Sequence, residues 1–364
     1  MRWMGLLVCV AALGCSEPPS GQLATSLRLG DLLQEGAADQ PFDKAEAVRA
    51  FQFPQDHGAH PTFRSEWWYV TANLEDADGN AYGVQFTVFR QALAPEAEPP
   101  ANPWRSAQVY LAHFAVSEVR AARHAEAERL SRAHPELAGV SGQPPRIMVN
   151  GWALQFANDG FSVTAEDGEI GADLRFRPTK PIALQGEAGL SRKSPGNASY
   201  YYSFPNLAVQ GSVRVGERRL AVTGTAWFDH EWSTSVLSDE QTGWDWFALH
   251  LEDGRDIMAF RLRRKDGARD PYDHGVVVAP DGSTHSLHAA DYSLTPERWW
   301  QAPDGVRWPL GWALELGEET LQIEAAFDDQ RMQTLVSYWE GAVVVNGAAQ
   351  GAGYMELTGY DQTN

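Results

Sequence analysis

The stretch Glu66-Trp-Trp-Tyr-Val-Thr-Ala-Asn-Leu-Glu-Asp76 returns in altered form as Gly243-Trp-Asp-Trp-Phe-Ala-Leu-His-Leu-Glu-Asp253. Both belong to a succession of short runs separated by Asp-Gly, Asn-Gly and Pro-containing turns, which is typical of an antiparallel all-β protein. Two further pairs follow in the same order: Gly151-Trp-Ala-Leu-Gln-Phe156 with Gly311-Trp-Ala-Leu-Glu-Leu316, and Val222-Thr-Gly-Thr-Ala-Trp227 with Leu357-Thr-Gly-Tyr360. Three pairs in one order predict two copies of a single β unit, roughly residues 50–230 and 231–364.

The segments around these repeats also indicate antiparallel strands. Tyr82-Gly-Val-Gln-Phe-Thr-Val-Phe89 alternates, and Asp-Gly pairs such as Asp78-Gly79 and Asp253-Gly254 supply hairpin turns. A unit of roughly 140–180 residues in short strands fits an up-and-down barrel. We therefore predict an all-β fold of two tandem lipocalin-like antiparallel β-barrels, with a pair of sandwiches or one larger barrel as alternatives. Ser117–Leu137, rich in Ala, Glu and Arg, is expected to form a helix between strands.

The N-terminus predicts that the protein is located in the cell envelope. Residues 1–14 combine Arg2 with a short apolar run, and they end in small residues before Cys15, as a lipoprotein signal peptide does. Lipidation of Cys15 would anchor the chain to a membrane, with 15–45 as a tether before domains 46–230 and 231–364. Ser16, which is not an aspartate, favours an outer-membrane lipoprotein facing the periplasm. The alternative is a secreted or soluble periplasmic protein.

Composition excludes several classes of function. The 364 residues include 48 acidic and 29 basic side chains, a net charge of -19, which disfavours nucleic-acid partners. No Gly-x-Ser-x-Gly elbow, phosphate loop or dinucleotide fingerprint is present, so serine hydrolase and nucleotide-dependent chemistry are unsupported. We expect neither a cofactor nor a disulfide.

Two short motifs carry most of the candidate chemistry. Asp229-His-Glu-Trp232 joins a histidine to carboxyl groups whose pKa values would rise in an apolar barrel. The alternative is that Asp229 and His230 only pair with each other or with arginines to satisfy a buried corner. Trp244-Asp-Trp246 places Asp245 on the face of its strand opposite to both indoles. Asp245 is then either an acid inside the barrel or an ordinary surface charge.

The first repeat offers weaker candidates. Asp56-His57-Gly-Ala-His60 could supply zinc ligands, but its spacing matches no established zinc motif, so no metal is expected. Glu66, with Arg64 or Arg90, is expected to form a buried ion pair. The aromatic run Tyr200-Tyr-Tyr202 lines a cavity or simply packs in the core.

Taken together, these motifs resemble the carotenoid 1,2-hydratase and AttH-like superfamily. The resemblance rests on Asp56-His-Gly-x-His60, Arg64-x-Glu-Trp-Trp-Tyr69, Tyr201-Tyr-Ser203, Gly224-x-Ala-Trp-x-Asp-His-Glu-Trp-Ser233 and Gly353-Tyr-x-Glu-Leu-Thr-Gly-Tyr360. It implies two lipocalin-like domains with the site between or inside them. In the hydratase branch, water adds to an isolated C=C bond without a cofactor, and the family's His-x-Trp motif falls on His230 and Trp232.

This resemblance leads to two functional hypotheses. The first is a hydro-lyase acting on an isoprenoid or similar lipid alkene in a barrel cavity, with Asp245 or Asp229 as proton donor. His230 then tunes the acid or positions water, and Trp232, Trp244 and Trp246 form a wall that stabilises a carbocation. Further ligand-binding candidates are Glu66, Trp67, Trp68, Tyr69, His57, Tyr201 and Tyr202. The second is a non-enzymatic lipid-binding or transfer lipoprotein that works with an ABC-type export permease. A structural relic with filled barrels is a third possibility.

Overall fold

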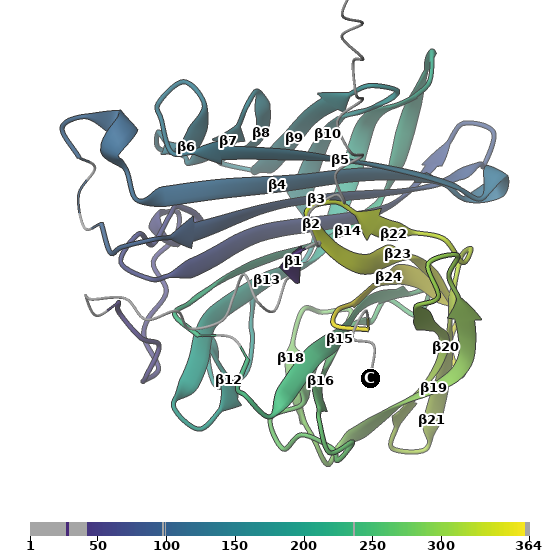
Figure 1. Ribbon diagram of the computed structural model, residues 1–364. Helices are drawn as coiled ribbons and strands as arrows, with labels where there is room; N and C mark the ends of the chain where they lie inside the picture. The colour runs from purple at the N-terminus through teal and green to yellow at the C-terminus, as the bar shows by residue number, and fades with distance from the viewer. Residues whose placement is uncertain (1–26, 29–41, 97, 99, 236, 361–364) are drawn as a thin grey trace, which may run out of the picture.

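The computed structural model describes residues 27–28, 42–96, 98, 100–235 and 237–360, and these form two antiparallel sheets (Figure 1). Cys15, the signal peptide and most of the tether lie outside the described residues. The first sheet is a half-barrel and the second curls into a nearly closed barrel. The predicted all-β fold with two tandem barrels is confirmed, and the single larger barrel is excluded. No helix in the described part is long and apolar enough to cross a membrane.

The first sheet is built from the N-terminal repeat. Its order is β5 (Arg123–Arg132), β4 (Gln108–Glu118), β3 (Ala81–Ala92), β2 (Ser65–Asp76), β14 (Arg218–Ser233), β13 (Asn197–Val215), β10 (Ile170–Pro178), β9 (Gly160–Asp167), β8 (Trp152–Ala157), β7 (Arg146–Val149) and β6 (Ala138–Ser141). The short strands β11 (Ala183–Leu184) and β12 (Leu190–Ser194) pair with β13. Short 3-10 turns are η1 (Gln55–His57), η2 (Pro103–Arg105) and η3 (Val119–Ala121).

The second sheet repeats this plan. Its order is β18 (Thr284–His288), β17 (His274–Val278), β16 (Asp256–Arg264), β15 (Gln241–Leu251), β24 (Gly351–Leu357), β23 (Val336–Gly347), β21 (Glu319–Ala325), β20 (Arg307–Leu316) and β19 (Tyr292–Gln301). Strands β1 (Leu27–Arg28) and β22 (Arg331–Gln333) pair with β23. The chain passes from the first sheet to the second between Ser233 and Gln241, slightly after the expected boundary at residue 231.

Of the three repeat pairs, only the first falls on equivalent strands. The Gly151 stretch lies on β8, three strands from β13, whereas the Gly311 stretch lies on β20, two strands from β23, and the third pairing was wrong in register. β2 lies between β3 and β14, just as β15 lies between β16 and β24. Tyr69 pairs with Asp229 in the first sheet, and its repeat equivalent Trp246 pairs with Glu356 in the second. The register therefore matches residues 222–227 with 349–354 instead of 357–360. The Thr-Gly pair shared by the two quoted stretches caused the error.

The helix predicted over Ser117–Leu137 is also wrong. This segment contains the end of β4, the turn η3 and the strand β5, which pairs with β4 along its whole length. Within β5, Ala125 and Ala127 pack against the core and alternate with Glu126 and Glu128. The period-two pattern and the neighbouring strand outweigh the intrinsic helix preference of Ala and Glu.

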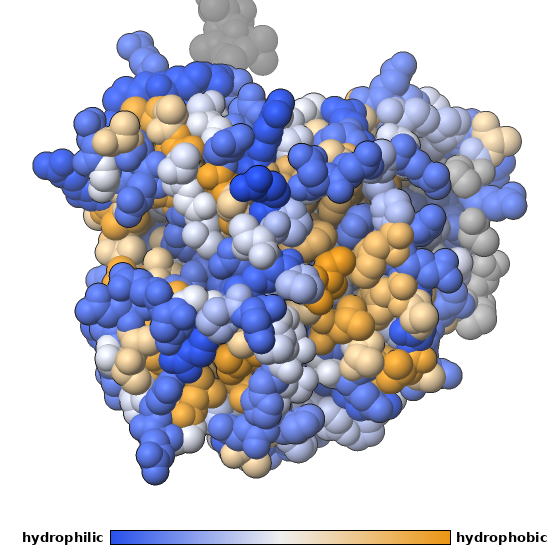
Figure 2. Space-filling model, turned by 180° about the vertical axis from the view of Figure 1, so that it is seen from behind, coloured by the Kyte–Doolittle hydropathy of each residue, from blue (hydrophilic) through white to orange (hydrophobic). Residues whose placement is uncertain are grey.

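Three clusters of buried side chains hold the molecule together. One fills the half-barrel and includes Trp68, Phe86 and Trp152, and another fills the second barrel around Trp312 and Trp339. A third cluster joins the two domains: Tyr69, Phe89, Tyr201 and Trp227 meet Trp244, Trp246, Tyr338 and Tyr354. Side chains occupy both barrel interiors, and the cluster between the domains lines a pocket. One face of the surface is mainly hydrophilic with scattered apolar patches, in keeping with the acidic composition (Figure 2).

Candidate functional site

Strands β2, β14 and β13 lie side by side and present alternate residues to two different environments. His230 and Trp232 face the interior of the half-barrel, together with Glu66, Trp68 and Tyr202. Their neighbours in sequence face the second domain: Trp67, Tyr69, Tyr201, Asp229 and Glu231. Because adjacent residues of a strand face opposite ways, each predicted motif contributes residues to two clusters, one on each side of the sheet.

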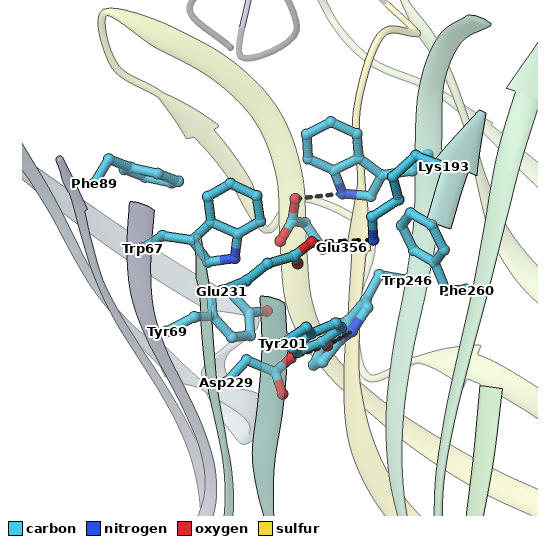
Figure 3. A pocket seen from close by; sticks show the side chains of 11 residues that line it. Trp67, Tyr69, Phe89, Lys193, Tyr201, Asp229, Glu231, Trp246, Phe260 and Glu356 are labelled. Atoms are coloured by element: carbon cyan, nitrogen blue, oxygen red, sulfur yellow. Dashed lines mark hydrogen bonds and ion pairs between the residues drawn. The ribbon is translucent and has the colours of Figure 1, made fainter. Parts of the chain in front are cut away.

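The cluster between the domains surrounds a small pocket (Figure 3). Its lining combines aromatic rings with ionisable groups: Trp67, Tyr69, Phe89, Lys193, Tyr201, Asp229, Glu231, Trp244, Trp246, Phe260 and Glu356. The free volume is about 50 Å³. Because one water needs at least about 10–15 Å³, the pocket has room for a few waters or for the end of a molecule.

Asp229 is the most heavily bonded acid of the pocket. The Tyr201 hydroxyl donates to its Oδ2 at 2.6 Å, while Ser203 Oγ and Trp227 Nε1 donate to Oδ1 at 2.5 and 2.7 Å. Trp246 Nε1 in turn donates to the Tyr201 hydroxyl at 3.3 Å. Complete burial raises the pKa of Asp229 to about 7, although these hydrogen bonds act in the opposite direction. Asp229 can thus hold a proton near neutral pH and release it inside an aromatic pocket.

The second repeat supplies an equivalent acid. Glu356, opposite Trp246 in the register, accepts a hydrogen bond from Trp244 Nε1 at 2.9 Å. Burial, together with the nearby Asp229 and Glu231 carboxyl groups, raises the pKa of Glu356 to about 8. Behind it, burial and the Glu356 charge hold the pKa of Glu340 well above its usual range. The pocket is therefore built from matching positions of both repeats, with Trp67 and Trp244 as one aromatic pair.

One ion pair belongs to the lining of the pocket. Lys193 Nζ lies 3.1 Å from Glu231 Oε1, and both side chains are buried. Ser199 Oγ also donates to this carboxylate. Lys193 lies 4.3 Å from the centre of the Phe260 ring. Lys193 and Ser199 therefore hold the Glu231 side chain in position, in the same pocket as Asp229.

Asp245 lies outside this pocket. It points into the second barrel, on the opposite face of β15 from Trp244 and Trp246. Its Oδ1 accepts hydrogen bonds from Arg263 Nη1 at 2.5 Å and from the Tyr360 hydroxyl at 2.8 Å. Asp245 and Asp229, the two candidate proton donors, therefore lie in different sites. Asp245 forms an ion pair with Arg263 inside the second barrel.

The histidines form a network inside the half-barrel. Glu66 Oε1 lies 2.7 Å from His60 Nδ1 and 2.9 Å from His230 Nε2, while Arg90 Nε donates to Oε2 at 2.7 Å. The predicted ion pair of Glu66 therefore forms with Arg90. Tyr202 contacts His230 and His57 through its hydroxyl, at 3.2 and 2.7 Å. The indole of Trp232 stacks on the His60 ring, and that of Trp68 stacks on the His230 ring.

Of the three histidines in this network, only His60 has a raised pKa. Burial lowers the pKa of His57, to about 3, and also lowers that of His230. Burial opposes the charge of His60 as well, but the Glu66 and Asp56 carboxylates outweigh it and raise its pKa. His60, Glu66 and His230 place ligand atoms within 4.8 Å of one another, a spacing that could hold a metal ion. Arg90 and the imidazole hydrogens already satisfy the same carboxylate, so the network is complete as a hydrogen-bonded cluster.

Several pocket residues were missed by the sequence analysis. Glu356 lies on β24, where the repeat alignment was wrong, and the correct register would have matched it with Asp229. Lys193 lies on β12, a short strand outside every motif. Trp227 was visible as part of a motif, but its bond to Asp229 depends on the strand geometry.

Comparisons with known proteins agree with this architecture. The AttH-like family model matches residues 44–360. A crystal structure assigned as an AttH protein (NE1406) from Nitrosomonas europaea is 33% identical, covers 88% of this chain and 100% of its own, and superposes with a TM-score of 0.79. Among curated protein sequences, none matches the chain.

Two more distant structures share the fold. Kievitone hydratase from Nectria haematococca is 15% identical, covers 91% of this chain and 99% of its own, and has a TM-score of 0.65. CghA, solved with Sch210972, is 14% identical, covers 90% of this chain and 97% of its own, and has a TM-score of 0.53. The family match over nearly all of the described residues is decisive: this chain belongs to the AttH-like family.

Proposed function

We propose that the chain is a hydratase-type acid catalyst that acts without a cofactor in the pocket between its domains. The observation that carries this proposal is Asp229, a fully buried carboxyl group with a pKa of about 7 among aromatic rings. A general acid works best when its pKa lies near the working pH. The distant likeness to kievitone hydratase concerns the fold, and the chemistry proposed here rests on Asp229 and its neighbours.

The proposed reaction balances with residues of the pocket. Asp229 Oδ2 gives its proton to one carbon of a C=C bond, and the Tyr201 hydroxyl stabilises the resulting carboxylate. The cation formed at the other carbon faces the rings of Trp67, Trp244 and Trp246, which attract positive charge. Water adds to that carbon and loses a proton to Glu231. Proton exchange between the carboxyl groups then restores Asp229, so that the net reaction is alkene plus water to alcohol.

The size of the pocket limits the substrate. A free volume of about 50 Å³ excludes a long lipid chain lying wholly inside. The substrate that fits is a neutral alkene presented end-on, for example the terminal C=C bond of an isoprenoid, with the half-buried Trp67 at the entrance. The C=C bond should carry enough alkyl groups to stabilise a tertiary cation. The carotenoid of the resembling hydratases is one member of this class.

A panel of neutral alkenes in ¹⁸O-labelled water tests the proposal. We expect mass spectrometry to detect an alcohol carrying the label with the wild-type protein, and Asp229→Asn to lower its rate of formation by about 10²–10⁴-fold, the usual contribution of a general acid. No labelled alcohol from any alkene that binds the wild-type pocket, or full activity in folded Asp229→Asn, would contradict the proposal.

We also propose the cellular setting implied by the sequence. Lipidation at Cys15 would anchor the protein to the outer membrane on its periplasmic side, and an ABC-type permease would supply or remove the apolar ligand. The acidic surface fits a tethered protein kept away from anionic lipid headgroups. A pull-down of the lipidated protein from membranes, followed by identification of any co-purifying permease, tests the partner. Recovery of the protein alone would contradict it.

A further inference from the structure

A row of polar side chains leads from the surface towards the pocket between the domains. It begins on β5 with Glu128, whose side chain is 24% exposed and whose Oε2 lies 3.1 Å from His113 Nε2 on β4. His113 is fully buried, and its Nδ1 lies 2.8 Å from the Tyr338 hydroxyl on β23. The row therefore passes from the first domain into the second through one imidazole ring.

Two carboxyl groups continue the row from Tyr338. Glu340 lies two residues beyond Tyr338 on β23, so both side chains face the same side of the sheet. Glu356 on β24 is directly opposite Glu340 in the register, a position in which Cβ atoms lie about 4.5–5.5 Å apart. Glu356 also lines the pocket, together with Asp229 and Glu231 (Figure 3). The row therefore ends at the carboxyl groups of the proposed reaction.

Glu340 is a buried acid whose oxygens are free to exchange protons. It is 1% exposed, and within the described residues neither Oε1 nor Oε2 has a hydrogen-bond partner. Two carboxylates directly opposite each other repel, so Glu340 and Glu356 do not both ionise readily. An acid of this kind can take up a proton at one oxygen while it releases another from the second. This property is what a proton carrier between Tyr338 and Glu356 requires.

The surroundings of Glu340 and Glu356 keep both groups protonated at neutral pH. Burial, and then the charges of Asp229 and Glu231, raise the pKa of Glu356 to about 8, and burial and the Glu356 charge hold that of Glu340 well above its usual range. Titratable groups from five strands face the pair: Tyr69 on β2, Lys193 on β12, Tyr201 on β13, Asp229 and Glu231 on β14, Tyr338 on β23 and Tyr354 on β24. Among the described residues of this set, the one cation, Lys193, is already paired with Glu231.

We propose that this row is a proton path from solvent to the pocket, made up of Glu128, His113, Tyr338, Glu340 and Glu356. The use of the path in catalysis rests on the proposed function. A substrate that fills a free volume of about 50 Å³ shuts water out of the pocket. A path through side chains can still supply the proton that the acid of the pocket has given away.

The path works as a series of single proton transfers. Glu356 gives its proton to a carboxylate of the pocket and takes one from Glu340, which takes one from the Tyr338 hydroxyl. Tyr338 receives the Nδ1 proton of His113, whose Nε2 takes a proton from Glu128, and solvent reprotonates Glu128. Each group gains one proton and loses one. His113 changes only its tautomer, so its ring stays neutral, and burial, which lowers the pKa of His113, favours that state.

A laser-induced pH jump tests the path on the full chain without any substrate. Photolysis of a caged proton takes the solution from about pH 9 to about pH 7, through the pKa of Glu356. Trp244 Nε1 donates to Glu356, so indole fluorescence reports proton uptake by this group. Glu356→Gln identifies the fluorescence phase that belongs to it. His113→Gln and His113→Ala interrupt the path, and His124→Ala, on β5 and outside the path, is the matched control.

We expect Glu356→Gln to abolish the phase and both His113 variants to slow it about 10²-fold, the lower end of what one positioned proton carrier contributes. The midpoint of the equilibrium titration should move by less than about 0.5 pH unit, because the path changes the rate of proton uptake and not its equilibrium. Imidazole should restore the rate of His113→Ala but not that of His113→Gln, whose side chain fills the space. His124→Ala should leave the rate unchanged.

Four outcomes would overturn the proposal: a wild-type protein without this phase, a phase that survives Glu356→Gln, an unchanged rate in folded His113 variants, or equal slowing by His124→Ala. Circular dichroism establishes that each variant is folded. Because no alkene is present, failure of the labelled-alcohol assay would leave these results as they are. The proton path and the proposed function can therefore fail separately.

Discussion

The replacement Asp229→Asn should change how the stability of the protein depends on pH. Burial raises the pKa of Asp229 from 3.8 to about 7. Between about pH 4 and pH 7, the folded protein therefore keeps a proton that the unfolded chain has lost. Stability contributed by this group is complete below about pH 4 and is lost as the pH rises through 7. A shift of about three pKa units corresponds to about 4 kcal/mol.

Asparagine resembles the protonated carboxyl group and does not ionise. The variant should therefore not lose this stability as the pH rises through 7. The free energy of unfolding of the wild type, minus that of Asp229→Asn, should fall by about 4 kcal/mol between pH 4 and pH 8. Urea unfolding followed by tryptophan fluorescence measures this difference. A difference that stays constant within about 1 kcal/mol over the range would refute the assignment of a raised pKa.

Ser203→Ala is a control, because the direction in which it shifts the pKa of Asp229 is known. The hydrogen bond from Ser203 to Asp229 lowers the pKa of the carboxyl group. Its removal should therefore raise that pKa further and move the loss of stability to higher pH. A shift to lower pH would show that another group causes the dependence.

Three further outcomes follow from the buried charges and the N-terminus. Glu66→Gln leaves Arg90 buried without its carboxylate, and urea unfolding should show a loss of about 3–5 kcal/mol; a loss below about 1 kcal/mol would contradict the assigned network. Asp245→Asn should destabilise through Arg263 in the same assay, yet retain formation of the labelled alcohol; loss of product from folded protein would make Asp245 the acid. Cys15→Ser should move the protein from the membrane fraction to the soluble fraction on immunoblots, and continued sedimentation would exclude the lipid anchor.

Strand alternation made the fold predictable. The repeated Trp-rich stretches fall on β2 and β15, which hold the same place in their sheets, and nearly all their residues are buried because both faces of these strands are covered. The segment 117–137 misled because Ala and Glu favour helices, while pairing with β4, a tertiary effect, decides its structure.

The candidate site was only partly predictable. Asp229, Trp244 and Trp246 were found from their motifs, and they meet in one pocket. Their neighbours Asp245 and His230 point to other environments, because adjacent residues of a strand face opposite ways. Which face of each strand meets the second domain depends on how the two sheets pack together. The local pattern of residues along one strand does not predict that packing.

The pH dependence of catalysis tests the central claim most directly. Once an alkene is hydrated by the wild-type protein, kcat/KM should fall as the pH rises through about 7, because only protonated Asp229 can act. In Ser203→Ala, the same fall should occur at higher pH. A rate that rises through this range, or a fall that Ser203→Ala leaves in place, would contradict Asp229 as the proton donor.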